Sequence, residues 1–142
     1  MEGLNIEALR KMCELNGIRP LVERSRSGKG THVWIFFKKA IPAATARNFG
    51  FLLLDKGSTS INLKSFHYYD RMYPSQDVAS SIGNLIALPL QGQALKNGNS
   101  AFVDENWNRK YQKKTSINFF YILINYMISS PTWKRKNFLT AL

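Results

Sequence analysis

The sequence predicts a mixed α/β (α+β) domain, with a mixed sheet flanked by helices, because helical and strand patterns alternate along it. Apolar residues recur at helical spacing over Ile6–Asn16. β-Branched and aromatic residues fill Thr31–Phe37, as expected of a strand. Pro42 and Gly57 then bracket a second helix, which we expect over Ala43–Asp55.

The first part of the chain carries boundary signals for each element. Asn5 can cap the first helix with its side-chain oxygen, and Gly17 suits the left-handed residue that ends a helix. A short strand over Pro20–Arg24 follows, and a glycine-rich turn then leads to the strand that begins at Thr31. The apolar stripe of the first helix consists of Ile6, Leu9, Met12, Cys13 and Leu15.

The second part predicts shorter elements. Ser58–Lys64 is expected to form a polar loop or a short strand, and Phe66–Tyr69 a strand that delivers Asp70 at its end. Pro74–Ile82 is expected to be a loop. Asn84–Leu90 is almost continuously apolar, which favours a central strand covered on both faces.

The composition points to a nucleic-acid partner. The length of 142 residues permits one domain at most. The chain contains 20 Lys and Arg against 9 Asp and Glu, so its formal net charge is +11. A chain this basic indicates a polyanionic partner, most often nucleic acid; the alternative is a basic surface without a dedicated partner.

Cysteine content and hydropathy favour a cytoplasmic protein. Cys13 is the only cysteine, so neither a disulfide within the chain nor a cysteine-type zinc site can form. Its helical context predicts a buried, small apolar residue. No signal peptide is visible at the N-terminus. The longest apolar run, Ile117–Ile128, is too short to span a bilayer, so no membrane partner is expected.

The run Arg24–Phe37 is the most informative segment for function. Gly28 and Gly30 can adopt positive φ angles in a turn, whose exposed backbone N–H groups can form a concavity for an anion. His32 lies beside that turn as the second residue of the following strand. The spacing is neither that of a P-loop nor that of a dinucleotide-binding fingerprint. The alternative is a surface hairpin turn with a half-buried histidine.

The strand after this turn should divide its side chains between two faces. His32, Trp34 and Phe36 would share one face. Val33, Ile35 and Phe37 would share the other. We expect Trp34 and Tyr69 to pack in the core, whereas Tyr68, Tyr73 and Trp107 are candidates for stacking on bases.

Ser27-Gly-Lys-Gly-Thr-His32, followed by an aromatic strand, resembles the second motif of the archaeo-eukaryotic primase superfamily. The stretch Glu23–Phe37 is similar to the primase domain of the TOTE conflict systems of bacteria and archaea. Three later segments resemble the same family in the same order: 69–77, 83–91 and 98–104. The resemblance covers residues 5–107. We therefore expect a primase-like domain over 1–107 and a divergent basic and apolar tail over 108–142.

The resemblance implies template-directed nucleotidyl transfer. A DNA primase-polymerase of this kind joins nucleoside triphosphates on a DNA template with Mg²⁺ or Mn²⁺, in DNA replication or phage defence. In the second motif of the family, a small residue, one variable residue and a histidine contact the triphosphate of the incoming nucleotide. Carried onto this chain, the implied triphosphate contacts are Arg24, Arg26, Ser27, Gly28, Lys29, Gly30, His32 and Arg71.

The family also holds its metals with an Asp-x-Asp pair before the second motif and a third Asp after it. Asp70 is the expected third ligand, and it joins His32 as an expected catalytic residue; Asp77 is the second choice for the metal. Without the resemblance, Asp70 beside Arg71 is equally compatible with a surface ion pair, and Asp77 with a loop-capping residue.

This sequence departs from the family pattern because it contains no Asp-x-Asp pair. The resemblance implies that the corresponding strand lies just upstream of Met1. We therefore expect an incomplete domain that holds the triphosphate-binding motif and one metal carboxylate and is inactive alone. The alternative function is a non-catalytic nucleic-acid or nucleotide-binding module. The apolar run Ile117–Ile128 is a candidate for self-association.

Overall fold

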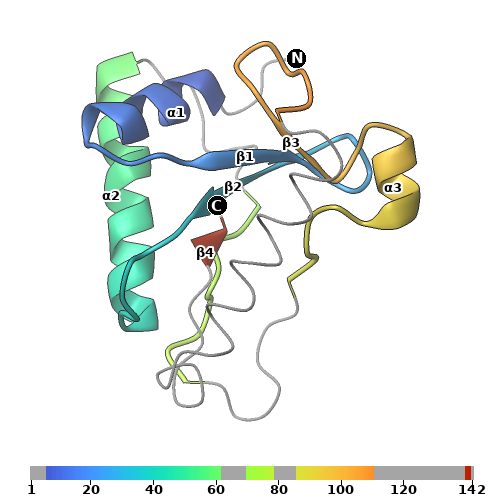
Figure 1. Ribbon diagram of the computed structural model, residues 1–142. Helices are drawn as coiled ribbons and strands as arrows, with labels where there is room; N and C mark the ends of the chain where they lie inside the picture. The colour runs from blue at the N-terminus through green and yellow to red at the C-terminus, as the bar shows by residue number, and fades with distance from the viewer. Residues whose placement is uncertain (1–5, 62–69, 79–85, 111–139, 142) are drawn as a thin grey trace.

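A computed structural model describes residues 6–61, 70–78, 86–110 and 140–141 of the chain (Figure 1). Helices and strands are combined in one mixed α/β fold, which confirms the predicted fold class. The helices are α1 (Ile6–Leu15), α2 (Ala43–Ile61) and α3 (Gly92–Lys96). The strands are β1 (Leu21–Arg24), β2 (Thr31–Ile35), β3 (Ala101–Val103) and β4 (Thr140–Ala141).

The strands form one four-stranded sheet in the order β3-β1-β2-β4, with every described pairing antiparallel. β1 and β2 form a hairpin through the glycine-rich turn, and Glu23 lies directly opposite His32. On its other edge β1 pairs with β3, which places Glu23 opposite Phe102. Glu23 is therefore central in the sheet, between a local partner and a partner distant in sequence.

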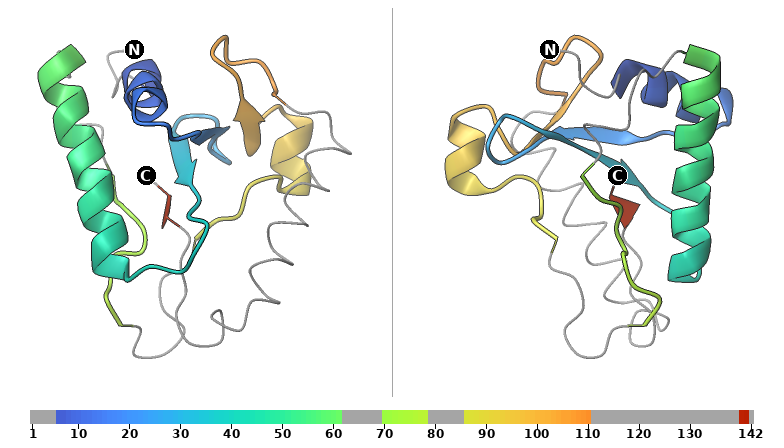
Figure 2. Two further views of the ribbon diagram at one scale, coloured as in Figure 1. Left: turned by 60° about the vertical axis from the view of Figure 1, so that its left-hand side comes forward. Right: turned by 180° about the vertical axis from the view of Figure 1, so that it is seen from behind.

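One face of the sheet carries the main hydrophobic core. Helices α1 and α2 lie together on this side of the sheet, and α3 lies on the opposite side (Figure 2). Val33 and Ile35 of β2 point into this core, as the predicted alternation requires. Its buried members are Leu9, Met12, Cys13, Val22, Val33, Ile35, Leu53, Leu54, Met72 and Val103. Burial and the charge of Glu14 raise the pKa of Cys13 to about 11, so the thiol stays protonated at neutral pH.

The opposite face of the sheet carries a smaller aromatic cluster. Trp34 and Phe102 are its buried centre, and Phe36 stacks on Trp34 with ring centroids 6.5 Å apart. Trp34 thus packs in the core, as predicted. His32 meets Trp34 edge to face at 6.4 Å between ring centroids, which places it on this second face.

Helix α2 is longer than predicted. It was expected to end near Asp55, but it continues to Ile61 through Gly57. The expected loop or short strand is therefore wrong over residues 58–61. A glycine inside a helix lowers helix stability by only about 1 kcal/mol relative to alanine. Gly57 alone therefore does not end α2.

The expected strand over Asn84–Leu90 is wrong across its described part, Ile86–Leu90. Pro89 has no N–H to give to a neighbouring strand, and Leu90 has a φ of 66°, outside the extended region. The amide of Leu90 instead donates to the carbonyl of Ser100 at 2.7 Å. The following segment contains the short helix α3 and then strand β3, neither of which the sequence patterns predict.

Several expectations concern parts of the chain outside the described residues. These are the Asn5 cap, the strand over Phe66–Tyr69 with the roles of Tyr68 and Tyr69, and the apolar run Ile117–Ile128. Within the described residues, no helix combines the length and the hydropathy that a membrane crossing requires.

The core on the helical side makes a clear stability prediction. Leu54 is 1% exposed and Leu52, on the same helix, is 57% exposed. Leu54→Ala should lower the free energy of unfolding by about 2–5 kcal/mol because it opens a cavity. Leu52→Ala, the matched control, should change it by less than about 0.5 kcal/mol. Urea unfolding of both variants measures this, and equal losses would contradict the assigned core.

Candidate functional site

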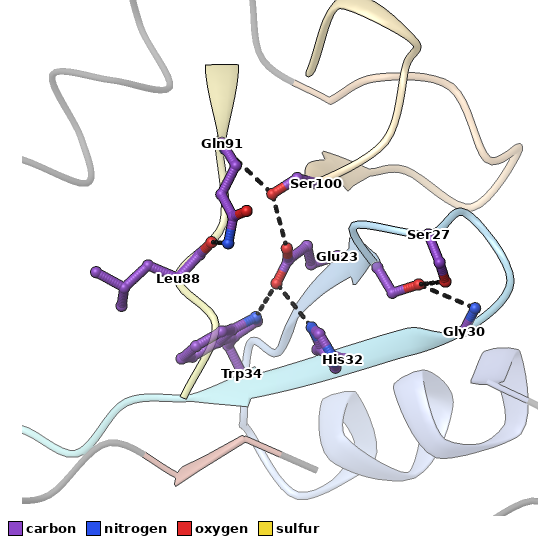
Figure 3. Close-up of polar contacts among 9 residues, drawn as sticks. Glu23, Ser27, Gly30, His32, Trp34, Leu88, Gln91 and Ser100 are labelled. Atoms are coloured by element: carbon purple, nitrogen blue, oxygen red, sulfur yellow. Dashed lines mark hydrogen bonds and ion pairs between the residues drawn. The ribbon is translucent and has the colours of Figure 1, made fainter. Parts of the chain in front are cut away.

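The turn between β1 and β2 is held by its own hydrogen bonds. The amide of Ser25 donates to the carbonyl of Gly30 at 2.8 Å, and the amide of Gly28 donates back to the carbonyl of Ser25 at 3.0 Å. The hydroxyl of Ser25 accepts the amide of Gly30 at 3.0 Å and lies 3.2 Å from the hydroxyl of Ser27 (Figure 3). The hydroxyl of Ser27 also accepts the amide of Lys29 at 3.3 Å. The turn is therefore a closed, braced loop.

This bracing bears on how the turn could bind an anion. The amides of Gly28, Lys29 and Gly30 already have acceptors within the turn. A phosphate could bind these amides only by replacing the serine oxygens or the Ser25 carbonyl. The side chains of Arg26 and Lys29 are exposed, so they can supply positive charge without breaking these bonds.

Gly28 is required at its position for two reasons. Its φ is +76°, which favours glycine. A Cβ atom there would also lie 2.7 Å from the side-chain oxygen of Asn99. The turn therefore touches the segment that leads into β3, which joins the glycine-rich motif to a distant part of the chain.

Arg24 provides a second link between these regions. Its guanidinium donates to the carbonyl of Gly98 at 3.0 Å and to the carbonyl of Trp107 at 2.8 Å. These two bonds attach Arg24 to the residues before and after β3. Direct contact between Arg24 and a phosphate would require at least one of these bonds to break. Trp107 itself has a φ of 60° and an exposed side chain.

The centre of the site is a buried carboxylate to which the sequence analysis gave no role. Glu23 is 1% exposed. Its Oε2 accepts the indole N–H of Trp34 at 2.8 Å and lies 3.1 Å from Nδ1 of His32. Its Oε1 accepts the hydroxyl of Ser100 at 3.4 Å (Figure 3). The role of Glu23 could have been predicted from the hairpin. Directly opposite residues of an antiparallel pair share one face, and Glu23 lies opposite His32.

His32 is partly exposed beside this carboxylate, with 36% of its side-chain surface accessible. The hydrogen bond to Glu23 raises the pKa of His32 above its usual value. The charges of Glu23 and Asp70 raise it further, and only the partial burial acts in the opposite direction. The negative charge of Asp70 therefore favours the protonated imidazole of His32.

Asp70 and Arg71 form an ion pair at the surface. Nε of Arg71 lies 3.2 Å from Oδ2 of Asp70, and the Asp70 side chain is 80% exposed. Nη1 of Arg71 also lies 3.5 Å from the hydroxyl of Tyr73. Both expected site residues are thus accessible, but each is partnered by the other.

Asp77, the second choice for a metal ligand, is engaged elsewhere. Its carboxylate pairs with Nη2 of Arg47 on α2, and Nη1 of the same guanidinium donates to the carbonyl of Pro74 at 3.0 Å. This arrangement ties the 70–78 segment to α2. Among the residues with described positions, no group of three or more His, Cys, Asp or Glu side chains could hold a metal ion.

A comparison with protein families matches this chain over most of its length. The family model described as the archaeo-eukaryotic primase domain of the TOTE conflict system matches residues 3–118. The chain belongs to this family. No curated protein and no solved structure matches the chain.

The structure brings some of the site residues predicted for this TOTE primase domain together. Ser27, Gly30 and His32 lie along one hairpin, and the charge of Asp70 raises the pKa of His32. Arg24 instead faces backbone carbonyls and Asp77 faces α2. The residues that shape the site without having been predicted are Glu23, Ser25, Trp34 in its hydrogen-bonding role, Asn99 and Ser100.

The two serines of the turn should differ in their effect on stability. Ser25→Ala removes the acceptor of the Gly30 amide at a nearly buried position and should lower the free energy of unfolding by about 1–2 kcal/mol. Ser27→Ala, the matched control, removes an exposed acceptor that water can replace, and should cost less than about 0.5 kcal/mol. Chemical unfolding of both variants checks this. A larger loss for Ser27→Ala would show that the bracing is assigned to the wrong hydroxyl.

Proposed function

We propose that this TOTE primase domain binds the triphosphate of an incoming nucleotide at the β1–β2 turn and His32, in support of template-directed nucleotidyl transfer. One observation carries the proposal. The His32 side chain is 36% exposed beside a turn with exposed cationic side chains, while its Nδ1 is held by a buried carboxylate. A histidine in this setting can donate a hydrogen bond from Nε2 to a phosphate oxygen.

The electrostatics of the turn suit a polyanion. Arg26 and Lys29 are exposed in the turn, and His32 has a raised pKa that increases its cationic fraction at neutral pH. Hydrogen bonds from a cation to a phosphate are stronger than those between neutral groups. Arg71 adds a further exposed guanidinium, which could exchange its bond to Asp70 for one to phosphate.

The metal expected for this chemistry would be Mg²⁺ or Mn²⁺. Mg²⁺ in nucleotide sites takes one or two carboxylates and completes its shell with phosphate oxygens and water. Asp70 fits as one such ligand because its carboxylate is exposed and is paired with the exposed guanidinium of Arg71. We assign no second protein ligand among the described residues, and Asp77 would first have to leave Arg47.

A second candidate function is nucleotide or nucleic-acid binding without catalysis. It is favoured by the absence of an Asp-x-Asp pair from the sequence, since nucleotidyl transfer uses two metals held by clustered carboxylates. A primer-extension assay with Mg²⁺ or Mn²⁺ separates the two functions. Template-dependent incorporation that Asp70→Asn abolishes supports the enzyme, whereas binding without incorporation supports the binding module.

Triphosphate binding tests the assignment of the turn. His32→Ala should weaken binding of dATP by on the order of 10-fold, because a charge-assisted hydrogen bond is lost. Lys29→Ala should also weaken it. Lys11→Ala, which removes an exposed lysine from α1, is the matched control and should leave it unchanged. Isothermal titration calorimetry measures all three, and equal effects of the two lysine variants would remove the turn from the site.

The net charge of +11 predicts nucleic-acid binding that depends strongly on salt. Each phosphate neutralised on single-stranded DNA should contribute about −0.7 to the slope of log affinity against log salt. Two oligonucleotides of equal length and composition but scrambled order should bind alike. Fluorescence anisotropy over a salt series measures both properties. An affinity that does not change with salt would contradict a basic binding surface.

A further inference from the structure

We infer that Glu23 is the positioning residue that orients the imidazole of His32 toward the triphosphate of a bound nucleotide. The inference rests on the proposed function, because it names the group that makes His32 competent for that role. Glu23 itself is buried and touches no ligand; it acts through the ring that it holds.

The first step is the choice of nitrogen. Nδ1 of His32 lies 3.1 Å from Oε2 of Glu23, a carboxylate oxygen that can only accept when ionised. An ionised Glu23 thus requires the proton of this bond to be on Nδ1. Because Nδ1 is engaged by Glu23 and the His32 side chain is 36% exposed, Nε2 is the ring nitrogen that remains for another partner. The nitrogen available for a phosphate is thus fixed as Nε2.

The second step is the rigidity of the carboxylate. The same Oε2 accepts the N–H of the buried Trp34 at 2.8 Å, and Oε1 accepts the hydroxyl of Ser100. The partners come from β2 and from the residue before β3, so Glu23 is anchored from two directions (Figure 3). A side chain held in this way can fix the orientation of the ring that binds it.

The third step concerns charge. A buried carboxylate is costly unless it is paired or hydrogen-bonded. Among the described residues no lysine or arginine pairs with Glu23, so the partner that can become cationic is His32. The groups that act on the charge of His32 are Glu23 from β1 and Asp70 from the 70–78 segment, and both favour the imidazolium. Glu23 therefore also favours a charged donor for the phosphate.

A purely structural role for Glu23 makes a different prediction. If Glu23 only satisfied the indole of Trp34 and the hydroxyl of Ser100, its replacement would alter stability and leave the titration of His32 unchanged. The two roles are therefore separated by the pH at which His32 loses its proton and by the pH dependence of nucleotide binding.

The test is the isosteric variant Glu23→Gln in the full chain. Glu14→Gln, which neutralises an exposed carboxylate on α1, is the matched control. NMR titration follows the imidazole resonances of His32, and calorimetry measures the binding of dATP across the same pH range. His32→Ala is measured alongside, because it defines the part of the pH dependence that belongs to the nucleotide alone.

We expect Glu23→Gln to move the titration midpoint of His32 to lower pH and to weaken dATP binding at neutral pH by about 10-fold. In the unmodified chain, the contribution of His32 to binding should be present at low pH and disappear as pH rises through its raised pKa. In Glu23→Gln that loss should occur at lower pH. Glu14→Gln should behave as the unmodified chain does.

The outcomes separate the two proposals. If His32→Ala binds dATP as tightly as the unmodified chain, the proposed triphosphate site is wrong. If His32→Ala weakens binding but Glu23→Gln changes neither affinity nor the His32 midpoint, the site stands and the positioning role is overturned.

If Glu23→Gln does not fold, the unmodified chain still decides. Its ¹⁵N shifts should show a neutral His32 protonated at Nδ1 and a midpoint above the ordinary histidine value of about 6.5. A neutral ring protonated at Nε2, or a midpoint at or below that value, would overturn the inference.

Discussion

The buried carboxylate of Glu23 is the constraint on which the rest of this site depends. It lies in β1 between the two strands that flank it, and its oxygens accept from Trp34 and Ser100 and bind His32. The desolvation of a carboxylate is offset only when such partners are all in place. The hairpin register, the position of the segment before β3 and the orientation of the histidine are therefore coupled through one side chain.

Local patterns were enough to predict the first helix, the hairpin and the two faces of β2. Each depends on residues close in sequence: an apolar stripe, a glycine-rich turn and strict alternation. The strand expected over Asn84–Leu90 is wrong at Ile86–Leu90, because a continuous apolar run has no period that identifies a strand and Pro89 cannot donate to a neighbouring strand. The expected end of α2 near Asp55 is wrong, because a glycine such as Gly57 permits a helix to end but does not require it.

The candidate site shows the same division between local and distant information. The sequence placed His32 beside the turn, because only strand alternation and turn chemistry were needed. It did not reveal that Arg24 faces the carbonyls of Gly98 and Trp107, or that the turn amides are already bonded to serines. The contacts of Arg24 depend on which distant residues pack beside it, and the bonds of the turn amides depend on the local conformation of the turn. Neither kind of contact produces a periodic pattern in the sequence.

The pairing of β1 with β3 has a consequence that we expect in the order of folding. The hairpin closes a loop of a few residues, whereas the bond between Ser100 and Glu23 joins residues 77 positions apart. Short loops close at a lower entropic cost, and distant contacts form more slowly. The hairpin can thus form early, while the carboxylate of Glu23 is still hydrated. The carboxylate is then buried when the segment before β3 packs against it. The histidine gains its final environment only when this distant segment docks, so we expect the site to be completed after the hairpin.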